Sequence, residues 1–313
     1  MRVSPAKTTC SVIIATYNRP EALAVTLEDL ARQSLPPDEV LVIDQSVDET
    51  GKPLDQSCTL RHSRLKYFHG RPANAQKARN FGIAQAIGDV VLLVDDDMRL
   101  PEGFVEAHMR NYEDTALGGV AGQVLKPGQK PQDFLPLHCI QDRAGWVRFP
   151  LNYALRTETA NWPSCNGSVR KKLAVTVGGF DEQFTRTLFD DTDFSKRLAD
   201  AGAKIVFDPD ATAVHRKVPS GGRRPGKLDD YVVADADSWA VQFYFWRKNF
   251  SLWTGRWQLS RLLRGVFVRK DFFAHPRSFV IAAKEMVRGW RMAIKRLAEG
   301  PRYGWTPATG PRR

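Results

Sequence analysis

Cysteine is scarce in this chain of 313 residues, and no apolar run reaches the ~18 residues that a membrane-spanning helix requires. The four cysteines, Cys10, Cys58, Cys139 and Cys165, form no C-x-x-C pair and have no histidines at zinc spacing. We therefore expect no disulfide framework, no structural zinc and a reducing, cytosolic location. The amino-terminal apolar run of about seven residues lacks a small-residue cleavage site, so neither a secretory signal nor a transmembrane segment is expected.

Acidic residues are also scarce in the last third of the chain. The net charge is +11, and residues 214–313 hold 21 Lys and Arg against 7 Asp and Glu, whereas residues 1–213 hold 25 against 28. Six of the eight tryptophans lie in the basic part. With 42% hydrophobic and 26% charged residues, the composition is that of a folded globular protein. A slightly acidic body and a basic, aromatic tail are expected, and the tail suggests a polyanionic partner surface.

Apolar runs and helix-like segments alternate through the first hundred residues. The runs rich in β-branched residues predict strands that are buried on both faces, and the segments between them place apolar residues at helical spacing. Such alternation predicts a Rossmann-like α/β fold, with a mostly parallel sheet flanked by helices. In chain order these segments are residues 10–16, 20–34, 39–44, 65–68, 73–87 and 90–94, and a further helix begins at Pro101.

Acidic residues follow two of the expected strands. Asp44 ends one strand, and Asp95-Asp96-Asp97 end another. Ligands of open α/β sheets bind outside the carboxyl ends of the strands, so these carboxylates are expected to converge on one crevice. Asp95 and Asp97 point to the same side and can bind a divalent cation together with a phosphate. The alternative is a solvated turn, in which Asp is common.

A second acidic cluster begins a helix further along the chain. Asp190, Asp191 and Asp193 precede apolar residues at helical spacing. Acids at a helix amino terminus are favoured by the macrodipole, so helix capping explains part of the cluster, and a general base is the functional alternative. His215 ends a short apolar run and, taken alone, is read more readily as a structural histidine.

The ordered set of motifs resembles the inverting GT-A glycosyltransferases of family 2 over roughly residues 9–217. The resemblance depends on SVIIATYNRP, VLVIDQS, ANAQKARNFGI, VVLLVDDDMRLPEGF, VGGFDEQF, DDTDFSKRLADAG and AVH, in that order. It implies transfer of a sugar from a nucleotide-diphosphate donor, a UDP-sugar foremost, to a hydroxyl of a glycan or polyprenyl-linked acceptor in cell-surface polysaccharide biosynthesis. It also implies a donor site formed by Thr16, Tyr17, Asn18, Asp44, Arg79, Asp95 and Asp96.

The same resemblance implies a metal site and a catalytic base. Asp97, with Asp95 and His215, matches the ligands of Mg²⁺ or Mn²⁺, and Asp191 matches the base. Two departures leave points open. Gln45 follows Asp44 where the family often has a second Asp or an Asn, which leaves the nucleobase contact open. Asp190 replaces the usual Glu, so either Asp190 or Asp191 is the base.

We expect three regions: a GT-A catalytic domain over residues 1–217, a flexible basic loop over 218–230, and a basic, Trp-rich helical region over 231–313. In the loop, Arg223, Arg224 and Lys227 either meet a diphosphate or are simply solvated. Residues 276–297 predict an amphipathic helix with Lys284, Arg288, Arg291 and Lys295 in one row. Its apolar stripe either packs on the body or lies in a membrane interface. The second alternative makes the protein cytoplasmic and peripherally bound to the inner face of the cell membrane, through an anionic lipid surface.

Two other functions compete with this interpretation. A basic nucleic-acid-binding protein fits the charge, but no helix-turn-helix, RNP-like or zinc-finger pattern occurs, so no nucleic-acid partner is expected. A sugar nucleotidyltransferase would carry a glycine-rich, basic loop directly after the first strand, where this chain has Ala15-Thr16-Tyr17-Asn18. The sugar, the acceptor and the choice between single addition and polymerisation stay open.

Overall fold

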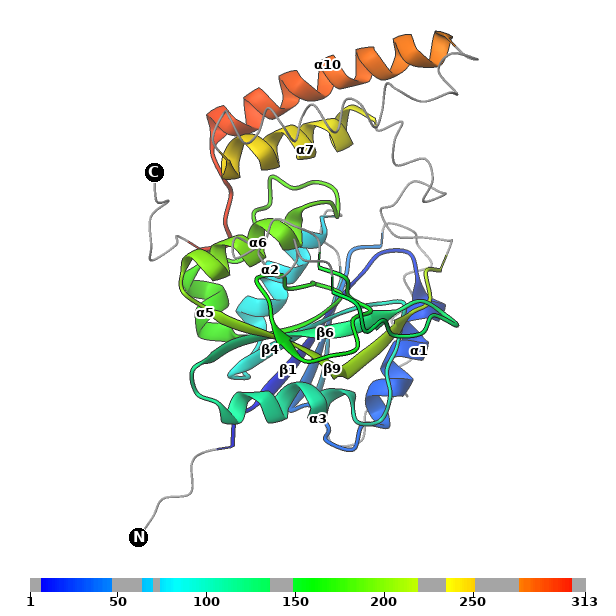
Figure 1. Cartoon of the computed structure of the whole chain (residues 1–313), viewed down its shortest axis with the longest axis vertical. Helices are drawn as coiled ribbons and strands as arrows, with labels where there is room; N and C mark the ends of the chain where they lie inside the picture. Colours follow the sequence, from blue (N-terminus) through cyan, green and yellow to red (C-terminus); the bar gives the residue numbers. More distant parts are fainter. Residues whose placement is uncertain are drawn as a thin grey trace.

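A computed structural model describes residues 7–46, 64–69, 74–135, 149–218, 235–250 and 276–305 (Figure 1). The strands are β1 (Cys10–Thr16), β2 (Glu39–Asp44), β3 (Arg64–His69), β4 (Val90–Asp95), β5 (Met98–Arg99), β6 (Leu117–Leu125), β7 (Thr157–Glu158), β8 (Asn166–Arg170) and β9 (Lys204–His215). The helices are α1 (Pro20–Ala31), α2 (Ala75–Gln85), α3 (Phe104–Met109), the 3₁₀ helix η1 (Arg110–Glu113), α5 (Lys171–Thr176), α6 (Asp190–Asp200), α7 (Ala236–Asn249) and α10 (Pro276–Glu299).

These strands form one mixed sheet in the order β3-β2-β1-β4-β8-β6-β9-β5, and β7 pairs with β9. Strands β3, β2, β1 and β4 are parallel, whereas β8 runs antiparallel to both β4 and β6. The expected α/β sheet, mostly parallel and flanked by helices, is confirmed. Its parallel half is formed by the segments whose apolar runs and helical segments alternate in the sequence.

The parallel strands are apolar on both faces because helices cover both. Val12, Val42 and Leu92 pack on one face in a core shared with α1 and α3. Ile13 and Leu93, from the same strands, pack on the other face against α2, α5 and α6. Figure 1 shows these two helical layers on opposite sides of the sheet. Side chains that alternate between two buried faces explain why the sequence runs are continuously apolar.

Helices α7 and α10 pack along each other and lie beyond α6 (Figure 1). They form a third core with Phe184 and Phe189 of the segment that precedes α6. After α10 the chain returns to the α/β body, where Tyr303 pairs with Asp181 and the Trp305 amide donates to the Gly178 carbonyl. The expected tail helices are present, and the division of the chain at residue 217 stays a prediction.

No helix within the described ranges is long and apolar enough to cross a membrane. Of the predicted basic loop, only Val218 is described; Arg223, Arg224 and Lys227 lie outside the described residues.

Candidate functional site

The predicted site residues of the strands lie at one edge of the sheet. In the parallel register Thr16 of β1 is opposite Asp44 of β2, and Ala15 is opposite Asp95 of β4. The acids that end β2 and β4 therefore lie on either side of the end of β1. This arrangement confirms the sequence argument that carboxylates at parallel strand ends share one edge.

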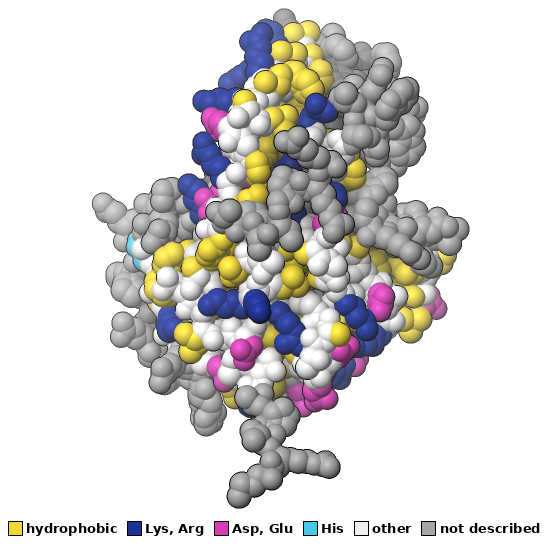
Figure 2. All heavy atoms as spheres, turned by 90° about the vertical axis from the view of Figure 1, so that its left-hand side faces the viewer, with side chains coloured by type: hydrophobic (Ala, Val, Ile, Leu, Met, Phe, Trp, Pro, Cys, Tyr) yellow, Lys and Arg dark blue, Asp and Glu magenta, His cyan; other side chains and the backbone are white. Residues whose placement is uncertain are grey.

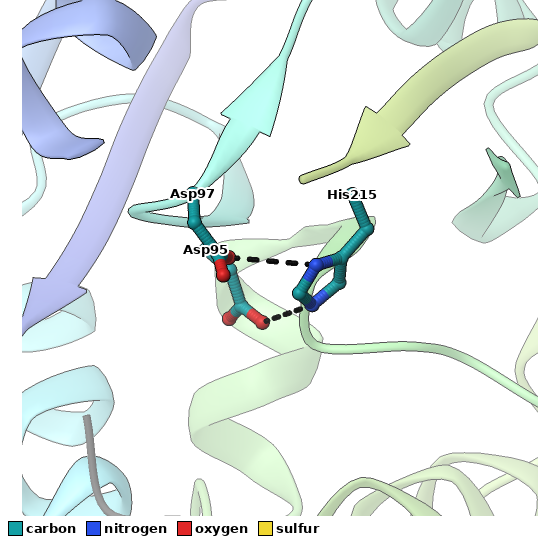
Figure 3. Close-up of side chains that lie close together, drawn as sticks. All are labelled: Asp95, Asp97 and His215. Atoms are coloured by element: carbon teal, nitrogen blue, oxygen red, sulfur yellow. Dashed lines mark ion pairs between the residues drawn. The ribbon is translucent and has the colours of Figure 1, made fainter. Parts of the chain in front are cut away.

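His215 joins this edge through a short strand pairing. Strand β5 pairs with the end of β9, with Met98 opposite His215, so the histidine ring lies beside the acidic turn. Its Nδ1 is 3.6 Å from Asp97 Oδ1, and its Nε2 is 3.8 Å from Asp95 Oδ2 (Figure 3). One ligand atom from each of the three residues lies within 4.8 Å of the other two.

The chemistry of these three side chains fits a divalent cation. The Asp97 side chain is only 1% exposed, and its Oδ1 is buried without a hydrogen-bond donor. A buried carboxylate oxygen without a donor is costly unless a cation neutralises it. Carboxylate oxygens suit Mg²⁺ and Mn²⁺, and imidazole is a ligand for transition metals. Asp95, Asp97 and His215 are thus able to hold a metal ion.

Asp96 points elsewhere and is braced by β1 and the start of α1. Thr16 Oγ1 donates to its Oδ2 at 2.7 Å, and Arg19 donates to its Oδ1 at 3.1 Å. Burial raises the pKa of Asp96 to about 6 against the opposing effect of Arg19. Arg19 also contacts Asp97 Oδ2 at 3.2 Å. Sequence reasoning missed Arg19, although a basic residue just after β1, next to three acids after β4, is a usable signal.

Asp44 is held by its own neighbours. The Ser46 amide donates to its Oδ1 at 2.8 Å, and the Tyr67 hydroxyl of β3 donates to its Oδ2. The backbone of Asn18 is in the left-handed region at φ 53°, and its backbone N–H donates to Ser46 Oγ. The half-buried Tyr17 precedes it. The residues predicted to bind the nucleotide-sugar donor at the ends of β1 and β2 therefore form one connected surface. Tyr67 and Ser46 also belong to it, and the sequence did not indicate them.

Arg79 of α2 connects the cluster of Asp95, Asp97 and His215 to the acids at the start of α6. It is buried, donates to Asp190 Oδ2 at 2.6 Å, and its other terminal nitrogen is 3.6 Å from Asp95 Oδ1. Gln76 also donates to Asp190 Oδ2, at 2.9 Å. Burial alone lowers the pKa of Arg79, but the carboxylates of Asp190, Asp95 and Asp191 outweigh burial and raise it. The guanidinium is permanently charged and lies between the two acidic clusters.

The two acids at the start of α6 have different surroundings. Asp190 is 4% exposed and occupied by Arg79 and Gln76, whereas Asp191 is half-buried and accepts the Thr192 amide at 2.8 Å. Neither caps the helix: the N-cap position is Phe189, whose φ of 63° is left-handed. Such strain in a residue with a side chain is kept where surrounding packing enforces it. Here the Phe189 ring stacks on Phe245 of α7 at 4.6 Å, so α7 helps to fix the start of α6.

An α/β sheet with an Asp-Asp-His cluster at its carboxyl edge, and a second acid pair on a nearby helix, agrees with the GT-A fold that the sequence motifs predicted. The sequence model described as "Glycosyl transferase family 2" matches residues 11–174, just over half of the chain. The chain belongs to this family, as the sequence motifs predicted.

A curated relative agrees with this assignment, and solved structures agree with the fold. The chain is 27% identical to "Succinoglycan biosynthesis protein ExoM" of Rhizobium meliloti (strain 1021), over 66% of each chain. The fold is similar to "Mannosyltransferase PcManGT from Pyrobaculum calidifontis in complex with GDP-Man and Mn2+", at a TM-score of 0.56 and 16% identity over 95% of this chain and 80% of that one. GalNAc-T7, solved with UDP, GalNAc and Mn²⁺, gives a TM-score of 0.57 at 16% identity over 78% and 50%. The chain spans 18% to 66% of the length of the first curated relatives that it matches.

Proposed function

We propose that this protein is a metal-dependent, inverting glycosyltransferase that moves a sugar from a nucleotide-diphosphate donor to an acceptor hydroxyl. A UDP-sugar is the first donor to test. The observation that carries the proposal is the Asp95, Asp97 and His215 cluster, which Arg79 connects to the acid pair of α6. Family membership and the Mn²⁺ in the similar structures support it.

Asp97, Asp95 and His215 would hold Mg²⁺ or Mn²⁺. The bound cation would neutralise the charge that develops on the departing diphosphate. Around it, Arg19 binds Asp97 through Oδ2 and leaves Oδ1 directed toward His215. Arg79 contacts Asp95 on the side of Asp190. Both arginines hold the carboxylates in fixed positions and reduce the repulsion among neighbouring acids.

Thr16, Tyr17, Asn18 and Asp44 would line the nucleoside end of the donor. Asn18 and Asp44 are linked through Ser46, so the nucleoside would lie against a connected, hydrogen-bonded surface. Asp96, bound by Thr16 and Arg19, would act by shaping this surface.

Asp191 is the proposed general base. It would take the proton of the acceptor hydroxyl while that oxygen attacks the anomeric carbon from the face opposite the diphosphate, which inverts the configuration in one displacement. Asp190 suits this role less well because its carboxylate is buried and engaged by Arg79 and Gln76. It would instead hold Arg79 and the start of α6 in place.

An experiment with two variants tests the role of Asp191. Purified protein is incubated with a panel of nucleotide sugars, and donor hydrolysis and transfer are followed. Asp191→Asn is expected to lower turnover by about 10²–10⁴-fold with the nucleotide Kd unchanged, because general bases contribute about that much and the attacking hydroxyl is left with its proton. Asp200→Asn, on the exposed far end of α6 and paired with Lys196, is the matched control. Near wild-type turnover of Asp191→Asn would refute the assignment.

The metal is tested by binding as well as by activity. Isothermal titration with Mn²⁺ is expected to give one site that is lost in Asp97→Asn, because that change removes a charged ligand. Chelation is expected to stop transfer. Full transfer in excess chelator, or unchanged Mn²⁺ affinity of Asp97→Asn, would contradict the proposed metal site.

The proposed acceptor is a glycan or polyprenyl-linked glycan of cell-surface polysaccharide biosynthesis. The printed name of the relative from Rhizobium meliloti, a succinoglycan biosynthesis protein, supports this class. Such acceptors are assembled on lipid carriers, so we propose that the protein works in the cytoplasm at the inner face of the cell membrane.

A further inference from the structure

Helix α10 has an inner face that is explained by its contacts. Ala282, Gly289 and Ala293 are buried against α7. A Cβ at Gly289 would lie 2.4 Å from Trp239 Cβ and 2.6 Å from the Ala236 carbonyl oxygen. Small side chains thus allow the two helices to pack closely, and this face needs no other partner.

The outer face of α10 carries an unusual share of the exposed apolar surface. Nine large apolar side chains are exposed in the described ranges, and six of them belong to this one helix. Figure 2 shows hydrophobic side chains over this part of the molecule, flanked by Lys and Arg. The six are Val280 (51% exposed), Ile281 (56%), Val287 (47%), Trp290 (40%), Met292 (36%) and Ile294 (49%).

The exposed residues of α10 are ordered by type. Val280, Val287, Trp290 and Ile294 follow each other at intervals of seven, three and four residues, so they share one stripe. The exposed Lys284, Arg288, Arg291 and Lys295 follow at four, three and four and form the next row around the helix. We call the stripe and the row together the outer α10 face. An apolar stripe beside a basic row is typical of helices that lie in the surface of a bilayer.

We propose that the outer α10 face docks on an anionic lipid bilayer. Charge complementarity favours this partner, since the basic row attracts acidic headgroups while the apolar stripe enters the boundary of the acyl chains. Trp290 is suited to that boundary because its ring is amphipathic. A nucleic acid would leave the apolar stripe in water. A second copy that met this face with the same face would bring two basic rows together.

Docking through this face would bring the start of α6, which carries Asp190 and Asp191, close to the lipid. The Trp290 ring contacts Phe243 of α7 edge to face at 5.1 Å, and Phe245 of the same helix stacks on Phe189. Phe189 immediately precedes Asp190 and Asp191. These ring contacts connect Trp290 of the outer α10 face, through α7, to the residue that precedes the acid pair. This part of the inference rests on the proposed function, because it brings the proposed base close to a lipid-linked acceptor.

Vesicle co-sedimentation of the full chain tests the docking surface. Vesicles of phosphatidylcholine alone are compared with vesicles containing phosphatidylglycerol, at low and at high salt. Strong binding is expected only with the anionic vesicles at low salt. A Lys284→Gln, Arg291→Gln, Lys295→Gln variant is expected to bind ten to a hundred times more weakly, since each basic residue near the surface contributes up to about fivefold.

A second variant tests the apolar stripe. Val287→Glu with Ile294→Glu is expected to weaken vesicle binding at least tenfold, because both side chains are about half exposed and would have to carry charge into the acyl boundary. Ile87→Glu is the matched control: Ile87 is 63% exposed and lies just before β4, at the opposite edge of the sheet from Asp95. Circular dichroism and light scattering check the folding and the oligomeric state of every variant.

Three outcomes would overturn the inference: no binding of the wild type to anionic vesicles at low salt, equal binding to neutral ones, or undiminished binding of both α10 variants. A change of oligomeric state in the α10 variants without a change in vesicle binding would make the face a contact between copies and would likewise refute it. Hydrolysis of the nucleotide-sugar donor in solution is expected to be unchanged in these variants. Failure of docking is therefore distinguishable from failure of the proposed transferase.

Discussion

Replacement of Lys248 by Met is expected to loosen the tail helices from helix α6. The Lys248 ammonium, on α7, is 2.7 Å from Asp181 Oδ2 and 2.7 Å from Asp193 Oδ1, and both carboxylates are fully buried. Burial alone lowers the pKa of Lys248, but Asp193 and Asp181 outweigh burial and raise it. One side chain thus ties α7 to the turn before α6 and to the first turn of α6 itself.

The expected loss of unfolding free energy depends on the hydrogen-bond and ion-pair partners that the two carboxylates retain. After the change, Asp193 retains Arg197 and Asn249, and Asp181 retains the Tyr244 hydroxyl and two backbone amides. Removing one partner of a buried ion pair costs about 3–5 kcal/mol. Because these donors remain, we expect the lower end, about 3 kcal/mol of the free energy of unfolding at pH 7.

The pH dependence separates this ionic effect from a simple packing defect. Burial acts to raise the pKa of Asp193, but Lys248 and Arg197 prevail and lower it below the ordinary value. A carboxylate with a lowered folded pKa stabilises the protein above its unfolded pKa of about 3.9, and this stabilisation is lost as the pH falls further. The difference between wild type and Lys248→Met is therefore largest at neutral pH and shrinks below about pH 4.

Urea unfolding at pH 7 and pH 3.5, followed by tryptophan fluorescence, measures this difference. Lys196→Met is the control, since Lys196 pairs with the exposed Asp200 on the same helix α6 and should cost less than about 1 kcal/mol. A loss below about 1 kcal/mol for Lys248→Met, or a loss of the same size at both pH values, would refute the reasoning.

Two further predictions concern buried groups of the α/β body. His108 is buried between Ser168 and Asn166, and burial lowers its pKa to about 4. The free energy of unfolding should therefore fall by about 2 kcal/mol between pH 7 and pH 5, because the histidine of the unfolded chain is protonated first. Urea titrations should show a smaller fall in His108→Asn, and equal falls would contradict the effect. Gly179→Ala should cost about 3 kcal/mol, because φ is +71° and the new Cβ would lie 2.5 Å from Asn80 Oδ1 and 2.7 Å from the Trp305 ring. Gly128→Ala, at φ +73° with no atom within 4 Å, should cost only about 1 kcal/mol. Urea unfolding of both glycine variants measures the two losses, and similar losses would disprove the steric argument.

Much of the carboxyl edge of the sheet was predictable because strand ends follow from apolar runs. The positions of Asp44 and Asp95 depend only on three buried strands being parallel and adjacent, and the structure has them so. The place of His215 is different. It depends on β5, a strand of two residues whose pairing with β9 leaves no periodic signal in the sequence. Only the family resemblance indicated this histidine.

The surroundings of Asp190 and Asp191 also could not be predicted from the neighbouring sequence. Asp190 is engaged by Arg79 and Gln76, which precede it by more than a hundred residues, and no spacing rule connects them. In α10, the apolar residues at helical spacing include both Met286 and Trp290, and periodicity alone puts them in one stripe. The structure divides it, because α7 covers only part of the circumference: Met286 packs into the shared core, and Trp290 stays 40% exposed.

The return of the chain after α10 has a practical consequence for recombination between relatives. The Glu182 amide donates to the Arg302 carbonyl, the Arg302 amide donates to Asp181, and the Trp305 ring lies against Gly179. A chimera that exchanges only the tail would join two surfaces that had never been selected together. Transplanting residues 178–182 with the tail should keep such hybrids soluble, and this short turn is thus the other half of the tail's attachment.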